Sequence, residues 1–170
     1  MIIGSILEKL EIDKRISITP EIAKKYINLG FEVQLPKKYG EHLGFNELDF
    51  ESIGVKIIND ENKILETSDI IIQMGILDDD KMTLLKSNQT FIGVLNSYEN
   101  NKQLMEISKK NVNLFSLELL PRITRAQSMD ILSSQANLAG YKAVIESFSV
   151  FEKAIPMMMT AAGTIPAAKV

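Results

Sequence analysis

The sequence contains no cysteine and no tryptophan, and His42 is its only histidine. Without cysteine, disulfide bonds, thiolate catalysis and cysteine-based zinc sites are excluded. A single imidazole without a cluster of carboxylates around it is weak support for a metal site or a general base. We therefore expect His42 in a surface loop and no bound metal.

Long apolar runs are absent as well. A membrane-spanning helix needs about 20 apolar residues, and the nearest candidate, residues 154–168, is interrupted by Pro156, Gly163 and Pro166. The amino terminus has too short an apolar run, and too early a charge, for a signal peptide. We expect a chain on the cytosolic side that does not itself cross a membrane.

Two further absences concern binding partners. The net charge is -3, with 19 Lys and Arg against 22 Asp and Glu, so no basic surface for nucleic acid is expected. The nine glycines are scattered, and none has the G-x-G-x-x-G spacing that holds the pyrophosphate of a dinucleotide. The pattern therefore indicates the look of a nucleotide-binding fold without the turn that grips the nucleotide.

Apolar runs and helical patterns alternate from the amino terminus to about residue 117. Strands are expected at residues 2–6, 31–35, 55–58, 69–74, 90–95 and 112–117, and helices at residues 20–30, 46–54, 60–67, 78–86 and 99–109. The run at 69–74 (DIIIQM) is apolar through its centre, which is typical of a strand buried on both faces. The pattern predicts an α/β fold with an open, mainly parallel sheet of about six strands and helices on both faces, of Rossmann or flavodoxin type.

Helix starts can be assigned to particular residues. Thr19 is expected as the N-cap of the first helix, with Pro20 at its first position. Asp78, Asp79 and Asp80 could bind a hard cation, but they precede KMTLLK, where the helix dipole favours acids. We interpret them as a helix start.

The last third of the chain combines a polar segment with a long helix. Apolar side chains recur at three- and four-residue steps and form one stripe, which predicts a buried scaffold helix; they are Leu138, Tyr141, Val144, Ile145, Phe148 and Phe151. The polar segment, residues 122–135, precedes this stripe and is rich in donors and acceptors: Arg122, Arg125, Gln127, Ser128, Asp130, Ser133, Ser134 and Gln135. These groups suit a flat polar ligand, or they are only helix caps and solvated arginines. Residue types alone leave both interpretations open.

Three stretches carry a family resemblance. PRITRAQSMDILSSQANLAGYKAV (residues 121–144), PMMMTAAGTIPAAKV (residues 156–170) and, more weakly, DKRISITPE (residues 13–21) resemble the alpha subunit of proton-translocating nicotinamide nucleotide transhydrogenase. That family is related to alanine dehydrogenase. The resemblance is near-continuous from residue 121 to residue 170.

The resemblance implies a domain plan and partners. It places an α/β amino-terminal domain at residues 1–126, a long helix leading out of it at 127–155, and a connector to a missing NAD-binding domain at 156–170. It implies hydride transfer from NADH to NADP+ coupled to proton translocation, with NADP(H) on a membrane-bound beta component. It further implies a homodimer attached peripherally to the cytoplasmic side of the inner membrane, and a chain that is inactive alone.

The resemblance also implies site residues. Arg122, Gln127 and Asp130 match the residues that orient the nicotinamide of NAD(H), and Ser133 matches another residue near the ring. Our hypothesis is that Gln127 and Ser133 hydrogen-bond the carboxamide while Arg122 and Asp130 fix each other and the ring. Transfer between two nicotinamides moves no proton at the reacting carbons, so it needs positioning rather than an acid or base.

Two other functions remain open. Alanine dehydrogenases resemble the chain at Arg15, but they also use a Lys after the fourth strand and a His after the fifth, where this chain has IIIQMGIL (residues 70–77) and FIGVLNSYEN (residues 91–100). Because deamination needs a proton-transfer group, an amino-acid dehydrogenase is disfavoured and Arg15 is expected to be a structural ion-pair partner. The third alternative is a non-enzymatic dimerisation or regulatory module.

Overall fold

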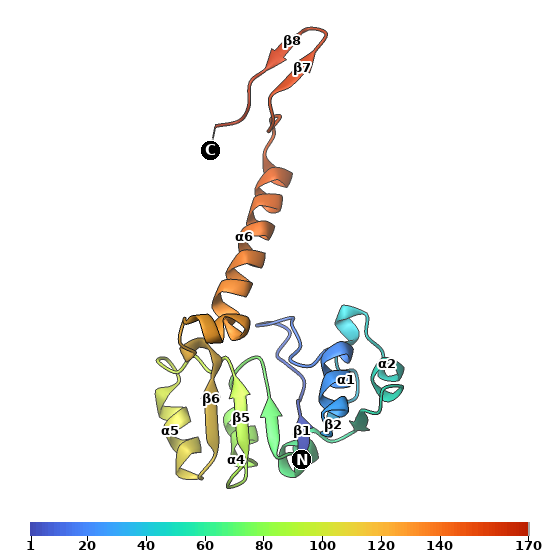
Figure 1. Ribbon diagram of the computed structural model, residues 1–170, viewed down its shortest axis with the longest axis vertical. Helices are drawn as coiled ribbons and strands as arrows, with labels where there is room; N and C mark the ends of the chain where they lie inside the picture. Colours follow the sequence, from blue (N-terminus) through green and yellow to red (C-terminus); the bar gives the residue numbers. More distant parts are fainter. Residues whose placement is uncertain (170) are drawn as a thin grey trace. The chain divides into compact units, whose positions relative to one another are not determined.

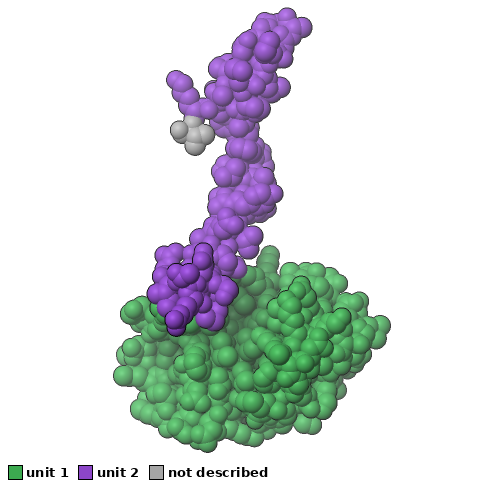
Figure 2. Space-filling view, in the orientation of Figure 1, with its two compact units in different colours: residues 1–121 green, residues 122–170 purple. Residues whose placement is uncertain are grey.

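The computed structural model describes residues 1–169 and divides into two units, Met1–Pro121 and Arg122–Val170, which Figure 2 distinguishes by colour. The last residue of the predicted connector, Val170, lies outside the described residues. In the first unit, six parallel strands form one sheet in the order β3-β2-β1-β4-β5-β6 (Figure 1). The strands are β1 (Ile2–Gly4), β2 (Glu32–Pro36), β3 (Lys56–Ile58), β4 (Ile70–Ile72), β5 (Thr90–Gly93) and β6 (Asn113–Ser116).

Helices connect successive strands, as right-handed crossovers between parallel strands require. They are α1 (Pro20–Asn28), the 3-10 helix η1 (Glu41–Leu43), α2 (Glu47–Glu51), α3 (Glu61–Thr67), α4 (Asp79–Thr83) and α5 (Asn101–Lys109), and a further 3-10 helix, η2 (Leu117–Leu119), follows β6. The predicted fold class, a Rossmann-like α/β sheet of six strands followed by a long helix, is confirmed.

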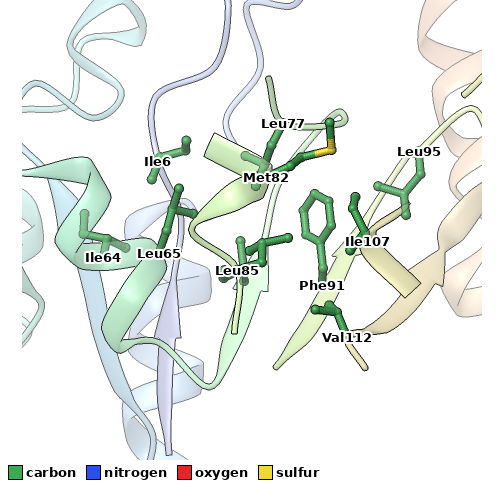
Figure 3. Close-up of a cluster of buried hydrophobic side chains, with 11 residues drawn as sticks. Ile6, Ile64, Leu65, Leu77, Met82, Leu85, Phe91, Leu95, Ile107 and Val112 are labelled. Atoms are coloured by element: carbon green, nitrogen blue, oxygen red, sulfur yellow. The ribbon is translucent and has the colours of Figure 1, made fainter. Parts of the chain in front are cut away.

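Two apolar clusters hold the sheet. One contains residues of α3, α4 and α5 packed on β4 and β5, with Phe91 in its centre between Met82 and Ile107 (Figure 3). The other contains residues of α1 and α2 packed on β1 and β2. Strand β4 contributes Ile71 to the first cluster, while Ile70 and Ile72 pack against the second. Since alternate side chains of a strand point to opposite faces, the clusters cover the two faces of one sheet.

The structure has the helix starts that were predicted at Thr19 and at Asp78. The Thr19 hydroxyl accepts a hydrogen bond from the Ile22 N–H at 3.4 Å, and Pro20 is the first helical residue. Asp78 is the N-cap residue of α4, although its side chain pairs with Lys9 instead of the helix. The acidic run therefore starts a helix, as predicted.

The second unit begins with a 3-10 helix, η3 (Thr124–Met129), and continues as α6 (Ile131–Val150). The long helix expected within residues 127–155 thus occupies its central part. Strands β7 (Met158–Thr160) and β8 (Gly163–Ile165) follow as an antiparallel hairpin that the sequence analysis did not predict. Gly163 has a positive φ of 126°, which permits the tight return.

The α6 stripe is not buried within this chain, although periodicity alone predicts a buried helix; exposure is what we expect where the carboxyl-terminal part of the subunit does not cover it. Among the described residues of this unit, none in α6 is buried. The side chain of Leu138 is 59% exposed, that of Tyr141 70%, and that of Phe148 46%. Periodicity identified which residues share a face, but it could not show whether other protein covers that face.

Candidate functional site

The polar segment changes conformation at Asp130. Residues 124–129 form η3, and Asp130 is extended, with φ -73° and ψ 94°. Its Oδ1 accepts the Ser133 N–H at 3.0 Å, which satisfies one of the free amides at the start of α6. Asp130 is therefore a helix cap, as the residue types allowed, and its second carboxylate oxygen makes further contacts.

The second carboxylate oxygen of Asp130 faces two other candidate residues. The Ser133 hydroxyl donates to Asp130 Oδ2 at 2.7 Å and accepts a bond from Arg122 Nη2 at 2.8 Å. Arg122 Nε lies 3.6 Å from the same Oδ2. The backbone and side-chain bonds from Ser133 lower the pKa of the Asp130 carboxyl below its usual value, so the group is a carboxylate at neutral pH.

A small pocket lies beside this cluster. It has a volume of about 200 Å³ and is lined by Arg122, Ile123, Thr124, Gln127 and Asp130. Pockets for whole drug-sized ligands are roughly 300–1,000 Å³, so this one suits a single planar group rather than an entire dinucleotide. Within residues 1–169, no hydrogen bond fixes the Gln127 amide. It can both donate and accept toward a ligand.

The segment therefore separates into two sets. Arg122, Gln127 and Asp130 line one pocket, and Ser133 links two of them. By contrast, Arg125 does not line the pocket, and the Ser134 hydroxyl donates to the backbone oxygens of Asp130 and Ile131 at 3.0 and 3.1 Å. Thr124 lines the pocket but was missed, because a lone Thr in a loop carries no sequence signal.

A larger pocket of about 520 Å³ lies within the first unit, at the carboxyl ends of β1, β4 and β5. The strand order reverses between β1 and β4, and ligands of open α/β sheets bind at such a point. The lining includes Glu8, Asp13, Arg15, Asp78 and Asn96. The sequence analysis missed this pocket because strand order, which creates it, cannot be read from a single sequence.

The charges in the larger pocket are already engaged. The Glu8 carboxylate accepts the Met74 N–H at 2.6 Å and the Ser17 hydroxyl at 3.2 Å. Burial raises the pKa of Glu8 despite these bonds. Arg15 is paired with Asp13 at 2.6 Å, as expected for a structural ion pair.

His42 lies outside both pockets that have been described so far. It is exposed on η1, and its Nε2 is 2.7 Å from the backbone oxygen of Lys14, to which it donates. In the described part of the chain, no group of three His, Cys, Asp or Glu residues could hold a metal ion.

A comparison with known families is decisive at this point. The family model described as "Alanine dehydrogenase/PNT, N-terminal domain" matches residues 5–139. The chain belongs to this family. The prediction of membership in the alanine dehydrogenase and transhydrogenase family is thereby confirmed.

Individual members of the alanine dehydrogenase/PNT family resemble the chain to different extents. It is 39% identical to a Rickettsia prowazekii protein, named as the first piece of an NAD(P) transhydrogenase subunit alpha, over 99% of its own length and 45% of that protein. It superposes on a crystal structure of transhydrogenase from Sinorhizobium meliloti with a TM-score of 0.87 and 35% identity, covering 98% of the chain and 50% of that structure. An alanine dehydrogenase of Halomonas elongata is 26% identical over only 48% of the chain and 22% of its own length.

The chain thus spans about half the length of the transhydrogenase relatives it matches. The name of the Rickettsia prowazekii relative describes a subunit that is divided into pieces. Across residues 1–169, no helix is both long and apolar enough to cross a membrane.

Proposed function

We propose that this chain is the amino-terminal portion of a transhydrogenase alpha subunit, and that its polar segment orients the nicotinamide of NAD(H). The reaction is hydride transfer to NADP+, coupled to proton translocation by a membrane component. The observation that supports this most strongly is the Arg122–Ser133–Asp130 cluster beside the unengaged Gln127 amide. Three residues implied by the family resemblance line the small pocket, and the fourth, Ser133, is hydrogen-bonded to two of them.

The hydrogen bonds refine the role of each residue. A serine hydroxyl has one proton, and that of Ser133 is given to Asp130. Ser133 therefore braces Arg122 against Asp130 instead of donating to a ligand. Gln127 is left as the residue that can both donate to and accept from a carboxamide, while Arg122 presents its remaining guanidinium donors to the pocket.

The site fits the chemistry that the cofactor supplies. NAD(H), when bound, provides the hydride, and no proton moves at the reacting carbons. The chain contributes an ionised carboxylate, a guanidinium and an amide, which hold and orient but do not transfer protons. Holding reactants in a near-attack geometry accounts for roughly 7–11 kcal/mol of a barrier, so positioning alone is a sufficient role.

The partners follow from the proposal. The phosphates of NAD(H) are held by a second NAD-binding domain of the same subunit, to which residues 156–170 connect. NADP(H) is held by a beta component in the membrane. The subunit forms a homodimer and lies peripherally on the cytoplasmic side of the inner membrane.

An amino-acid dehydrogenase is the second candidate, because Arg15 lines the larger pocket. Within that lining there is no histidine, and its lysine, Lys9, is paired with Asp78. Oxidation of alanine requires a group that takes a proton from the amine. An alanine oxidation assay on the assembled enzyme separates the two candidates, and turnover there would refute the transhydrogenase assignment.

The direct test uses variants of the polar segment in the assembled enzyme. R122A removes charged hydrogen bonds worth about 1.5–3 kcal/mol, which corresponds to a 10- to 100-fold loss of hydride-transfer rate. Q127A removes neutral bonds and should lower the rate about tenfold. The matched control is R125A, in the same segment but outside the pocket lining, which should retain the wild-type rate. Unchanged turnover in R122A and Q127A would refute the proposed site.

A further inference from the structure

Thr124 is the first residue of η3 and lines the same small pocket as Arg122, Gln127 and Asp130. It is exposed, and within the residues that the structure describes its hydroxyl has no hydrogen-bond partner. Thr124 is not among the residues that the family resemblance implies. The pocket therefore contains one polar group to which no role has been given.

The carboxamide of a nicotinamide places a defined demand on such a pocket. Like the amide of Asn or Gln, it has one oxygen that accepts hydrogen bonds and an NH2 group with two N–H donors. A polar group that is taken out of water without a partner costs free energy. A pocket that holds the carboxamide therefore has to offer a donor to its oxygen and two acceptors to its NH2 group.

Arg122 can supply the donor. A guanidinium has five N–H groups and no acceptor. One of them is given to Ser133, from Nη2 at 2.8 Å, and Nε faces Asp130 Oδ2 at 3.6 Å. The Arg122 side chain is 70% exposed, so its other N–H groups are available to the carboxamide oxygen. Because it accepts nothing, Arg122 cannot bind the NH2 group.

Several acceptors of the pocket lining are already in use. The two carboxylate oxygens of Asp130 accept bonds from Ser133 at 3.0 and 2.7 Å, and this side chain is only 16% exposed. The Ile123 backbone oxygen accepts the Ala126 N–H at 2.9 Å. The Gln127 backbone oxygen accepts the Asp130 N–H at 3.3 Å. These groups are poor candidates for a further bond to a ligand.

Two side-chain acceptors are left in the lining as the structure describes it. They are the amide oxygen of Gln127 and the hydroxyl oxygen of Thr124. A hydroxyl has two acceptor lone pairs, and its own proton rotates to suit the partner. Gln127 alone would leave one N–H of the carboxamide without an acceptor, and Thr124 provides the second.

We propose that Thr124 is a ligand-binding residue of the nicotinamide site, and that its hydroxyl oxygen accepts one N–H of the carboxamide while Gln127 accepts the other. This rests on the proposed function. Every residue involved belongs to the second unit. Thr124 in this role recognises the amide of the ring substituent, so it favours a carboxamide over a ketone at the same position.

The test is T124V in the assembled enzyme, with T124S and S128A as controls. Valine has nearly the shape of threonine and lacks the hydroxyl, while serine keeps it. Ser128 is an exposed hydroxyl of η3 that does not line the pocket. Titration calorimetry gives the Kd for NAD+, for its 3-acetylpyridine analogue, in which a methyl group replaces NH2, and for ADP-ribose, which lacks the ring. Hydride transfer from NADPH is measured with the first two.

We expect T124V to raise the Kd for NAD+ about three- to tenfold, which corresponds to the loss of one neutral hydrogen bond. The Kd for the acetylpyridine analogue and for ADP-ribose should stay within twofold of wild type, and hydride transfer at low NAD+ should fall by the same factor as the affinity. T124S and S128A should match wild type with each ligand. An unchanged Kd for NAD+ in T124V overturns the proposal. Equal losses for NAD+ and the analogue also overturn it, because the hydroxyl then has another partner than NH2.

Two more variants complete the test. If T124V does not fold, T124A removes the same hydroxyl and is held to the same comparison of NAD+ with its analogue. R122A distinguishes the two levels of inference. If R122A loses hydride transfer and T124V binds NAD+ as wild type does, only the role of Thr124 fails; if R122A keeps wild-type hydride transfer, the proposed function fails.

Discussion

Tyr39 offers the sharpest test of how the first unit is stabilised. Its ring is buried, and its hydroxyl accepts the N–H groups of Ser17 and Ile18, each at 3.1 Å. The hydroxyl also contacts Ser5 Oγ at 3.0 Å, and Ser5 in turn donates to Gln73. Since both acceptor sites of the phenol oxygen are used, its proton goes to Ser5. One oxygen therefore connects the turn after β2 with the residue that follows β1 and with the segment before α1.

The Y39F variant removes that oxygen and leaves two amides without an acceptor. An unsatisfied buried donor costs about 1–3 kcal/mol. Ile18 is fully buried and incurs the whole cost, while Ser17 is half-buried and incurs less. We expect a loss of about 2–4 kcal/mol, against a typical total of about 5–15 kcal/mol. With a urea dependence of about 2 kcal/mol per molar, the unfolding midpoint falls by about 1–2 M.

The assay is urea unfolding followed by circular dichroism, with Y98F as the control because Tyr98 is 88% exposed. Burial raises the pKa of Tyr39 to about 12. Because the pKa of Tyr39 is higher in the folded state than the unfolded value of about 10, the phenol contributes its full stabilisation of the folded state below pH 10. This contribution is lost as the pH rises through 12. The difference between wild type and Y39F should therefore shrink from pH 10 to 12. If Y39F and Y98F have the same midpoint at pH 7, the reasoning is refuted.

Three other predictions concern the sheet, the larger pocket and α6. A Cβ at Gly93 would lie 2.6 Å from the Gln73 backbone oxygen, so G93A should lower the free energy of unfolding by about 1–3 kcal/mol. Because Gly75 has open space around it, G75A should leave that free energy almost unchanged. Equal urea midpoints for the two variants would contradict this. Burial raises the pKa of Glu8, so the contribution of this group to stability should be greatest below the ordinary pKa of glutamate and should be lost as pH rises through the folded-state pKa. In urea titrations from pH 4 to 7, the stability of the wild type should therefore fall relative to that of E8Q, and a constant difference would contradict this. The exposed apolar stripe of α6 should cause self-association of the chain in sedimentation experiments, and Y141E with F148E should reduce it; a monodisperse wild-type monomer would exclude it.

Local signals in the sequence predicted most of the first unit. Thr19 before Pro20 and the acids before α4 mark helix starts through interactions within a few residues, and such interactions can be recognised without the fold. The apolar centre of β4 indicated a strand covered on both faces, which the split of Ile70, Ile71 and Ile72 between two clusters confirms. Strands β1, β4, β5 and β6 were predicted one or two residues too long at their carboxyl ends, because apolar residues continue into the loops there.

Non-local features could not be predicted. The larger pocket exists because β1 pairs with β4 as well as β2, and only the fold shows this. The bond from Ser133 to Asp130 depends on side-chain orientation, so sequence reasoning placed both residues in the site but assigned Ser133 a different donor role. The roles of Arg122, Gln127, Asp130 and Ser133 remain predictions until the variants are measured.

The position of β1 has a consequence for biosynthesis. This strand precedes both of its partners in the chain, yet it lies in the interior of the sheet, between strands that begin at Glu32 and Ile70. Its second edge stays open until β4 has been translated. A nascent polypeptide of this protein must protect an incomplete sheet during that interval, so slow codons or early stalling upstream of β4 would favour misfolded product.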